Sequence, residues 1–365
     1  MKIMILADAS SPHTIRWANA LSELHINVLV VSLTPFYNDN YNQNIQLHSL
    51  SKDIKLSQNK GISEKISYFK LLKPVKKLIK SFKPDILHAY YASSYGFIGA
   101  LSRFKPFVIS VWGSDVFEFP KLGFLQKKIL KYNLKAANTI FATSEALAAE
   151  TKLYTNTSIH ILPFGINLEK FFPVDQNYEF FTIGTVKGMR DIYGITDLIK
   201  SFALAQNLAP EIPWKLLLVG DGPNIDEYKN LVKSLNIDDK TQFTGYVNHN
   251  ETPYYYNQMN VFVALSRSES FGVAVLEAQA CGVPVIVSNV GGLPEVVDDQ
   301  NTGFIIDRNN HQKAAQLFVK LATDKLIYTS LSQKAVEFVK LYYDWKDSVQ
   351  QQYNFYKELI TNYYK

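Results

Sequence analysis

The chain has 365 residues, of which 47% are apolar and 19% charged, with a formal net charge of +5. This length exceeds what one hydrophobic core usually organises and the composition is ordinary for a folded protein, so we expect two domains and no extended disorder. The single cysteine, Cys281, excludes an internal disulfide framework and a zinc cluster, and it is compatible with a reducing compartment.

The first half of the chain alternates short apolar runs with helical patterns. Ile3–Leu6 predicts a buried strand, and Ser11 followed by Pro12 predicts the N-cap and first residue of a helix. Helical patterns separate the further predicted strands, which are Val28–Leu33, Asp85–His88, Phe107–Val111, Thr139–Thr143 and Ile159–Leu162. This alternation is typical of βαβ units and a parallel sheet, where ligands bind at the carboxyl ends of the strands.

A second alternating series follows. Pro163, Pro173 and a polar stretch predict a linker over about 164–180. The predicted strands beyond it are Phe181–Gly184, Trp214–Val219, Thr241–Phe243, Val261–Ala264 and Val283–Val287. Residues 344–365 predict a final helix with an aromatic apolar side. Two doubly wound domains that face each other would leave a cleft for a substrate.

The segment SRSESFGVAVLEAQACGVPVIVSNVGGLPEVV, residues 266–297, carries the strongest chemical signal. Glu269 lies in a polar loop after a strand, and a helix is expected to begin near Gly272. The N–H groups at such a helix N-terminus favour anions or sugar oxygens. Glu277, about one turn into the helix, could accept both hydroxyls of a ribose. The alternative is a capping carboxylate at Glu269 and a solvated Glu277.

These two glutamates, separated by seven residues around a glycine, resemble the signature of retaining glycosyltransferase family 4, the glycosyl transferases group 1. LVGDGP, FTGYV, NVGGLPEVV and NTGF also occur in family order and at family distances, and the resemblance is strongest over 181–306. It implies an α/β fold of the GT-B kind, with two doubly wound Rossmann-like domains and a cleft between them. The implied acceptor-binding domain is 1–165, the nucleotide-sugar-binding domain is 175–345, and a helix at 346–365 crosses back to the first domain.

The resemblance also implies site residues. The family's arginine and lysine for the donor diphosphate are replaced by Thr185 and Tyr193, which leaves Lys187 and Arg190 as the available cations, unless they are plain loop charges. The implied donor-binding residues are Lys187, Arg190, Gly220, Tyr246, Ser270, Phe271, Gly272, Val273 and Glu277. The implied catalytic residues are Glu269, Lys187 and Asp115. The Gly220 loop could equally be a turn at a strand end.

The first domain departs from the family at one position. In ISVWGSDVFEFP the residue before the glycine is Trp112, where the family often has histidine, so a histidine contact to the donor sugar is not expected. The resemblance implies that the leaving phosphate takes the acceptor proton and that no side-chain base is needed. His13 follows a predicted strand and His88 ends one, and each could contact acceptor or phosphate, or be structural.

No metal motif is visible, and we expect neither a cofactor nor a divalent cation beyond the nucleotide-sugar donor itself. Two basic segments stand out: 65–83 with seven lysines and 121–135 with five, neither with an acid. We hypothesise that they contact an anionic membrane surface, and the alternative is that each helix packs on the sheet and solvates its lysines. A nucleic-acid partner is not expected, since the net charge is modest and no recognition module is present.

The sequence therefore predicts a retaining transferase that moves a sugar from a UDP- or GDP-sugar onto a glycan or lipid-linked acceptor, in cell-envelope or exopolysaccharide biosynthesis. A nucleotide-sugar epimerase or hydrolase of the same fold is one alternative, and a non-catalytic glycan- or nucleotide-binding protein is another. The N-terminus has no leader character and no apolar run approaches the roughly 20 residues that span a bilayer. We accordingly expect a cytoplasmic protein associated with the inner face of the membrane.

Overall fold

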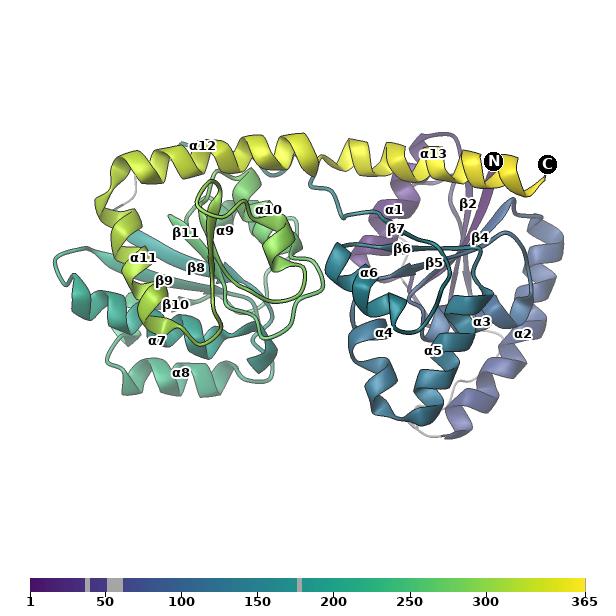
Figure 1. Ribbon diagram of the computed structural model, residues 1–365, viewed down its shortest axis with the longest axis horizontal. Coiled ribbons are helices and arrows are strands. Elements are labelled where there is room, and N and C mark those ends of the chain that lie inside the picture. The colour runs from purple at the N-terminus through teal and green to yellow at the C-terminus, as the bar shows by residue number, and fades with distance from the viewer. Residues whose placement is uncertain (37–39, 51–61, 176–178, 365) are drawn as a thin grey trace. The chain divides into compact units, whose positions relative to one another are not determined.

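The computed structural model describes residues 1–36, 40–50, 62–175 and 179–364, and of residues 62–69 it describes the backbone alone. The chain divides into two compact units, each with its own parallel sheet (Figure 1). The first unit is Met1–Pro163 together with Ser348–Lys365, and the second is Phe164–Asp347.

The first unit is a doubly wound α/β unit. Its sheet has the order β3-β2-β1-β4-β5-β6-β7, and every neighbouring pair is parallel. The strands are β1 (Lys2–Leu6), β2 (Asn27–Ser32), β3 (Gln46–Ser49), β4 (Ile86–Tyr90), β5 (Phe107–Val111), β6 (Thr139–Ala142) and β7 (Ile159–Ile161). The helices are α1 (Pro12–Glu23), α2 (Ile62–Phe82), α3 (Ser94–Ser102), α4 (Ser114–Phe117), η2 (Phe119–Leu122), α5 (Phe124–Ala136), α6 (Glu145–Lys152) and the part of α13 (Trp345–Tyr363) from Ser348 on.

Burial on both faces explains why the strands of this unit are continuous apolar runs. Every residue of β4 and of β5 is buried. A parallel sheet needs this pattern because helices cover both of its faces. The predicted strands are present, with small shifts of their ends, whereas the short and more polar β3 was not predicted.

The second unit has the strand order β10-β9-β8-β11-β12-β13, again parallel throughout. Its strands are β8 (Phe181–Val186), β9 (Trp214–Val219), β10 (Thr241–Phe243), β11 (Val261–Ala264), β12 (Val285–Ser288) and β13 (Gly303–Ile306). Its helices are α7 (Ile195–Leu208), α8 (Ile225–Ser234), α9 (Thr252–Tyr256), α10 (Val273–Ala280), α11 (His311–Thr323) and α12 (Lys325–Tyr342), with short 3-10 turns η3 (Asp191–Tyr193), η4 (Asp238–Lys240) and η5 (Leu293–Val296).

Strand β11 shows how this second sheet is sandwiched. Val261 and Val263 belong to the apolar cluster that includes residues of α7 and α11. Between them, Phe262 contacts the ring of Tyr256 at the end of α9, with ring centroids 5.7 Å apart. Successive side chains of a strand point to opposite faces, so helices bury both sides of β11.

The segment expected to be a linker belongs instead to the second unit. Phe164, Ile166 and Phe171 are buried there. Ile166 forms an isolated parallel bridge with Asp344, and a Cβ at Gly165 would lie 2.5 Å from the Cα of Trp345. The chain segments that enter and leave this unit therefore run side by side, and the prolines that suggested a linker mark only the ends of a packed segment.

Candidate active site

The predicted donor-binding residues of the second unit lie at the carboxyl edge of its sheet. Strand order reverses between β8 and β11, because the chain proceeds outward from β8 through β9 to β10 and then returns to β11. In open α/β sheets ligands bind at this switch point. Lys187 directly follows β8, and Glu269 lies in the loop after β11. The two residues thus flank the place where a ligand is expected.

Lys187 and Glu269 form an ion pair at this edge. Lys187 Nζ lies 2.5 Å from Glu269 Oε2, and the two side chains are only 11% and 14% exposed. The ammonium also lies 5.1 Å from the centre of the Tyr193 ring. Partial burial strengthens electrostatic interactions relative to bulk water. The pair therefore places one cation and one carboxylate, each held in position, beside the start of α10.

The loop that carries Glu269 packs tightly against the loop after β12. Gly292 N donates to Glu269 O over 3.0 Å. Gly291 has φ +52°, and a Cβ at this position would lie 1.9 Å from Glu269 O. Only glycine allows this approach, because it has no Cβ and adopts positive φ without strain. Gly291 and Gly292, the GG pair of NVGGLPEVV, thus fix the position of the Glu269 backbone.

Helix α10 begins with a left-handed glycine. Gly272 is its N-cap, with φ +117°, and a Cβ there would lie 3.0 Å from Val296 Cγ2. The first turn of a helix leaves N–H groups without intrahelical acceptors, and the helix macrodipole makes this end attractive to anions. No acidic side chain occupies this first turn. The helix thus begins where the sequence predicted, with Ser270 in the preceding loop, and the donor contacts of Phe271, Gly272 and Val273 stay a prediction.

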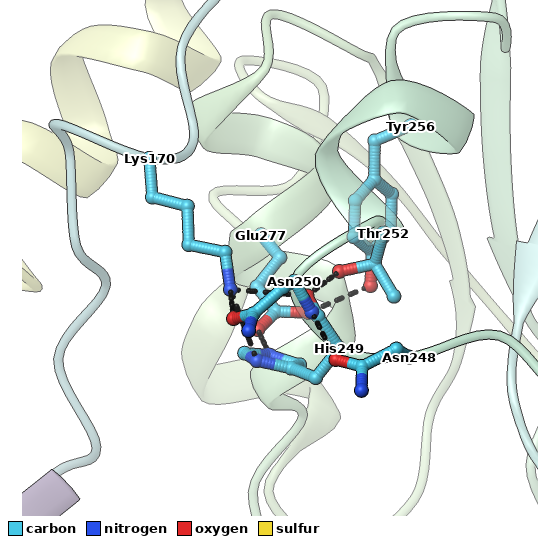
Figure 2. Close-up of polar contacts among 7 residues, drawn as sticks. All are labelled: Lys170, Asn248, His249, Asn250, Thr252, Tyr256 and Glu277. Atoms are coloured by element: carbon cyan, nitrogen blue, oxygen red, sulfur yellow. Dashed lines mark hydrogen bonds and ion pairs between the residues drawn. The ribbon is translucent and has the colours of Figure 1, made fainter. Parts of the chain in front are cut away.

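Glu277, in α10, is held on both carboxylate oxygens (Figure 2). Its Oε1 lies 2.7 Å from His249 Nε2, and its Oε2 accepts from the hydroxyl of Tyr256 over 2.8 Å. Burial, reinforced by the charge of Glu277, raises the pKa of Tyr256 well above its usual value, so the phenol keeps its proton and donates. The Glu277 side chain is 6% exposed, and the half-exposed His249 lies beside it.

Lys170 completes this cluster from the segment that enters the second unit. Its Nζ lies 3.3 Å from His249 Nδ1, 3.0 Å from His249 O and 2.9 Å from Asn250 Oδ1. Sequence analysis did not single out Lys170, His249 or Tyr256. One signal could have found His249: it follows β10, and loops after parallel strands gather at the same sheet edge.

The other predicted donor residues have different surroundings. Gly220 directly follows β9, has φ +132°, and a Cβ there would lie 2.1 Å from Lys187 O. Its loop therefore supports the backbone of Lys187. Arg190 is exposed, and Tyr246 is exposed over 77% of its surface. Thr185 lies inside β8 and is buried, so its side chain does not take the place of the family's arginine.

Asp115, predicted to be catalytic, is enclosed in the first unit. It is buried and accepts hydrogen bonds from the backbone N–H groups of Ala92 (2.8 Å), Gly113 (2.9 Å) and Trp112 (3.2 Å). Burial raises the pKa of this carboxyl, and the N–H groups partly oppose that shift. Asp115 thereby holds the loops after β4 and β5 together, and its predicted catalytic role stays a prediction.

His88 is likewise a structural residue. It is buried, with Nδ1 2.5 Å from the hydroxyl of Tyr356 and Nε2 2.8 Å from Ser110 Oγ. His13 differs, because it is only partly buried and lies edge-on to Trp112, with ring centroids 5.7 Å apart. Trp112 is partly buried beside Tyr91. These aromatic groups, and not His88, line the carboxyl edge of the first sheet.

Two wider features of the described residues concern metals and membranes. No group of three or more histidine, cysteine, aspartate or glutamate side chains is arranged to hold a metal ion in the described part of the chain. None of the helices searched there combines the length and apolar character needed to cross a bilayer.

Comparison with known proteins identifies the family. Glycosyl transferases group 1 matches residues 167–338, and Glycosyl transferase 4-like matches residues 2–144. The chain belongs to glycosyltransferase family 4. It is a glycosyltransferase with the GT-B fold, as the two parallel α/β units and its structural neighbours show.

Its relatives include enzymes that make glycoconjugates. The N-acetyl-alpha-D-glucosaminyl L-malate synthase of Bacillus anthracis is 25% identical, over 70% of this chain and 70% of its own length. The alpha-monoglucosyldiacylglycerol synthase of Streptococcus pneumoniae is 26% identical, over 71% of this chain and 64% of its own. The structure of Anabaena HepE in complex with UDP has a TM-score of 0.82 at 16% identity, covering 98% of this chain and 100% of that one. As a member of family 4, this chain thus shares the fold of a UDP-binding protein.

Proposed function

We propose that this glycosyltransferase transfers a sugar, with retention of configuration, from a UDP- or GDP-sugar to a glycan or lipid-linked acceptor in cell-envelope or exopolysaccharide biosynthesis. The observation that carries the proposal is the Lys187–Glu269 pair beside the N-terminus of α10. A nucleoside diphosphate needs cationic and N–H partners for its phosphates, and a transferred sugar needs a fixed polar partner for its hydroxyls. The edge of the second sheet offers both kinds of group.

The roles follow from charge. Lys187 and the first-turn N–H groups of α10 bind the diphosphate, and their attraction grows as the leaving group gains negative charge. When the donor binds, Glu269 gives up its ion pair with Lys187, which then binds the phosphate. Glu269 accepts hydrogen bonds from the sugar hydroxyls. Glu277 accepts from the ribose hydroxyls. The acceptor proton passes to the leaving phosphate, so the reaction depends on tightly held geometry and on no side-chain base.

The surface of the first unit supports the proposal of a lipid-linked acceptor. Leu122, Phe124 and Leu125 are exposed over 72%, 74% and 48% of their surfaces, although they are large apolar side chains. The five lysines of 121–135 are all exposed, and Lys128 Nζ lies 4.4 Å from the centre of the Phe124 ring. Exposed apolar groups among lysines suit the interface of an anionic bilayer. A relative that acts as a diacylglycerol glycoside synthase also favours a lipid-linked acceptor.

The second basic segment, 65–83, fits the alternative in which its helix packs on the sheet and solvates its lysines. Residues 65–69 lie outside the described side chains. Beyond them, Leu71 and Val75 of α2 are buried in the core, whereas Lys73, Lys76 and Lys77 are exposed. Helix α2 thus packs its apolar side inward and solvates its lysines, so the proposed membrane contact rests on 121–135.

Substitution of Glu277 tests the donor site. Glu277→Ala should weaken UDP or GDP binding by roughly 1–3 kcal/mol, because a charged acceptor of two hydroxyls is lost. Isothermal titration calorimetry measures this change. Unaltered affinity for both nucleotides would remove Glu277 from the ribose site.

Substitution of Glu269 separates transfer from binding. Glu269→Ala should abolish sugar transfer without weakening nucleoside diphosphate binding, because this carboxylate is assigned to the sugar and its removal leaves Lys187 free for the phosphate. A screen of nucleotide sugars by thermal shift supplies the donor for the assay. Donor hydrolysis or epimerisation with no transfer to any glycan or glycolipid acceptor would favour the alternative enzymes. Binding with no turnover would favour a non-catalytic protein.

A further inference from the structure

We propose that His249 is a positioning residue of the donor site, which orients the carboxylate of Glu277 toward the ribose and is itself fixed by Lys170. This inference rests on the proposed donor-binding role of Glu277. It is carried by one continuous chain of polar contacts, Lys170 to His249 to Glu277, within the second unit (Figure 2).

The contacts of His249 define which of its ring nitrogens carries the proton. Lys170 Nζ lies 3.3 Å from Nδ1, and an ammonium group can only donate, so Nδ1 is the acceptor. The proton of the ring is then on Nε2, which lies 2.7 Å from Glu277 Oε1. Lys170 thereby selects the tautomer that donates to the carboxylate.

Lys170 also fixes the loop on which His249 lies. The ammonium is within hydrogen-bonding distance of His249 O and Asn250 Oδ1, at 3.0 and 2.9 Å. The hydroxyl of Thr252, which follows this loop, donates to the same His249 O over 2.9 Å. The ring of Phe171 packs beside the imidazole, with centroids 5.7 Å apart. His249 is therefore held through its backbone as well as through its ring.

Glu277 keeps capacity for a ligand after these contacts are made. Its two oxygens offer about four lone-pair sites, and His249 and Tyr256 occupy one on each oxygen. One site per oxygen remains, which matches the two hydroxyls of a ribose. Since both existing partners donate from fixed positions, they also decide the plane of the carboxylate and hence the direction of the remaining lone pairs.

The inference predicts that His249 affects only the recognition of ribose hydroxyls. His249→Ala should weaken binding of UDP roughly tenfold, the loss expected for one charge-assisted hydrogen bond, and leave binding of 2′,3′-dideoxy-UDP unchanged. If the protein binds GDP in preference, GDP and dideoxy-GDP replace the uridine pair. In the transfer assay the KM for the donor should rise while kcat at saturating donor stays the same.

Companion variants separate positioning from damage to the fold. His249→Gln retains an N–H donor and should recover most of the lost affinity, and Lys170→Met should cause a smaller loss in the same direction. In a Glu277→Ala background, His249→Ala should have no further effect on UDP binding, because the group through which it acts is absent.

Several outcomes would overturn the inference. Equal losses for UDP and its dideoxy analogue would make His249 a general support of the loop, and tighter UDP binding by His249→Ala would mean that the imidazole competes with the ribose. If Glu277→Ala abolishes discrimination against the dideoxy nucleotide and His249→Ala retains it, the positioning role of His249 is wrong and the ribose role of Glu277 stands. If the unaltered protein does not discriminate at all, the proposed ribose role of Glu277 fails first.

Discussion

Lys187 and Thr185 lie two positions apart at the end of β8 and have different surroundings. Thr185 pairs with Leu218 inside the sheet and is buried. Lys187 is the first residue beyond β8 and meets Glu269 at 2.5 Å. The sequence offered Lys187 and Arg190 as equivalent cations, and the structure pairs the first and leaves the second exposed.

Gly291 provides a test of the close packing under Glu269. Gly291→Ala would bring a Cβ to 1.9 Å from Glu269 O, so the loop that carries Glu269 must shift. We expect transfer activity to fall at least tenfold, since geometry supplies much of the rate in this mechanism. Steady-state kinetics with the identified donor measures the effect.

Gly245→Ala is a matched control for this variant. Gly245 also has positive φ, +70°, but nothing lies within 4 Å of the Cβ it would gain. Both substitutions therefore carry the backbone strain of a left-handed alanine, about 1–2 kcal/mol, and only Gly291→Ala adds the collision. Equal activities for the two variants would show that the approach to Glu269 does not matter for transfer.

At the scale of elements, helix α13 is anchored to the first sheet by a buried polar chain. Gln352 Nε2 donates to the hydroxyl of Tyr356, this hydroxyl is hydrogen-bonded to His88 Nδ1, and His88 Nε2 is hydrogen-bonded to Ser110 Oγ. Burial lowers the pKa of His88 from 6.5 to about 3. The imidazole is therefore neutral in the folded protein over a range in which it is protonated in the unfolded chain.

This anchor predicts a pH dependence of stability. Below pH 6.5 the unfolded chain binds a proton at His88 that the folded unit does not bind until about pH 3, so the free energy of unfolding decreases as the pH falls through this window. The slope from one such group is about 1.4 kcal/mol per pH unit, and the contribution is fully present above pH 6.5. Urea unfolding between pH 4 and 7 should give a shallower dependence for His88→Gln. Parallel curves for the two proteins would contradict the burial of a neutral imidazole.

The elements of the two sheets could largely be predicted from the sequence, because a strand buried on both faces must be a continuous apolar run. Strands such as Phe107–Val111 and Val261–Ala264 have their predicted bounds. Segments stabilised by a few long-range contacts could not be recognised in this way. Ile166 is buried through its pairing with Asp344, and nothing local in a proline-flanked, polar stretch indicates that partner.

In the candidate site too, features with local sequence signatures could be predicted and those that depend on long-range contacts could not. The loop and helix around Glu269 and Gly272 were predictable, because a glycine at a helix start and a following apolar strand have local signatures. The three backbone N–H groups that converge on Asp115 could not be predicted, because nothing in the sequence indicates them. The contact of His249 with Glu277 joins residues 28 positions apart and has no local signature, so only the place of His249 after β10 could have indicated it.

At the scale of the whole molecule, the surface of 121–135 predicts reversible membrane binding. The protein should float with anionic vesicles at low salt and not with neutral phosphatidylcholine vesicles, because each lysine near anionic lipid contributes about 1 kcal/mol. Replacing Leu122 and Phe124 together by serine should reduce binding at unchanged charge. Liposome flotation measures both effects, and no binding to anionic vesicles at low salt would count decisively against this attachment.

A control for apolar loss lies in the other unit. Leu208, at the end of α7, is exposed over 58% of its surface and lies outside the basic segment. Leu208→Ser should leave flotation unchanged. If it reduces binding as much as the double variant does, the vesicles capture exposed apolar groups in general, and the basic segment is not a specific membrane contact.

The division of the chain into units has a consequence for how it folds during synthesis on the ribosome. The first unit needs Ser348–Lys365, which are synthesised only after the whole of Phe164–Asp347. Until Tyr356 emerges, His88 lacks one of its two partners, and the surface that α13 covers is open to water. The second unit can therefore reach its native state before the first, which reverses the usual N-to-C order of domain folding during translation.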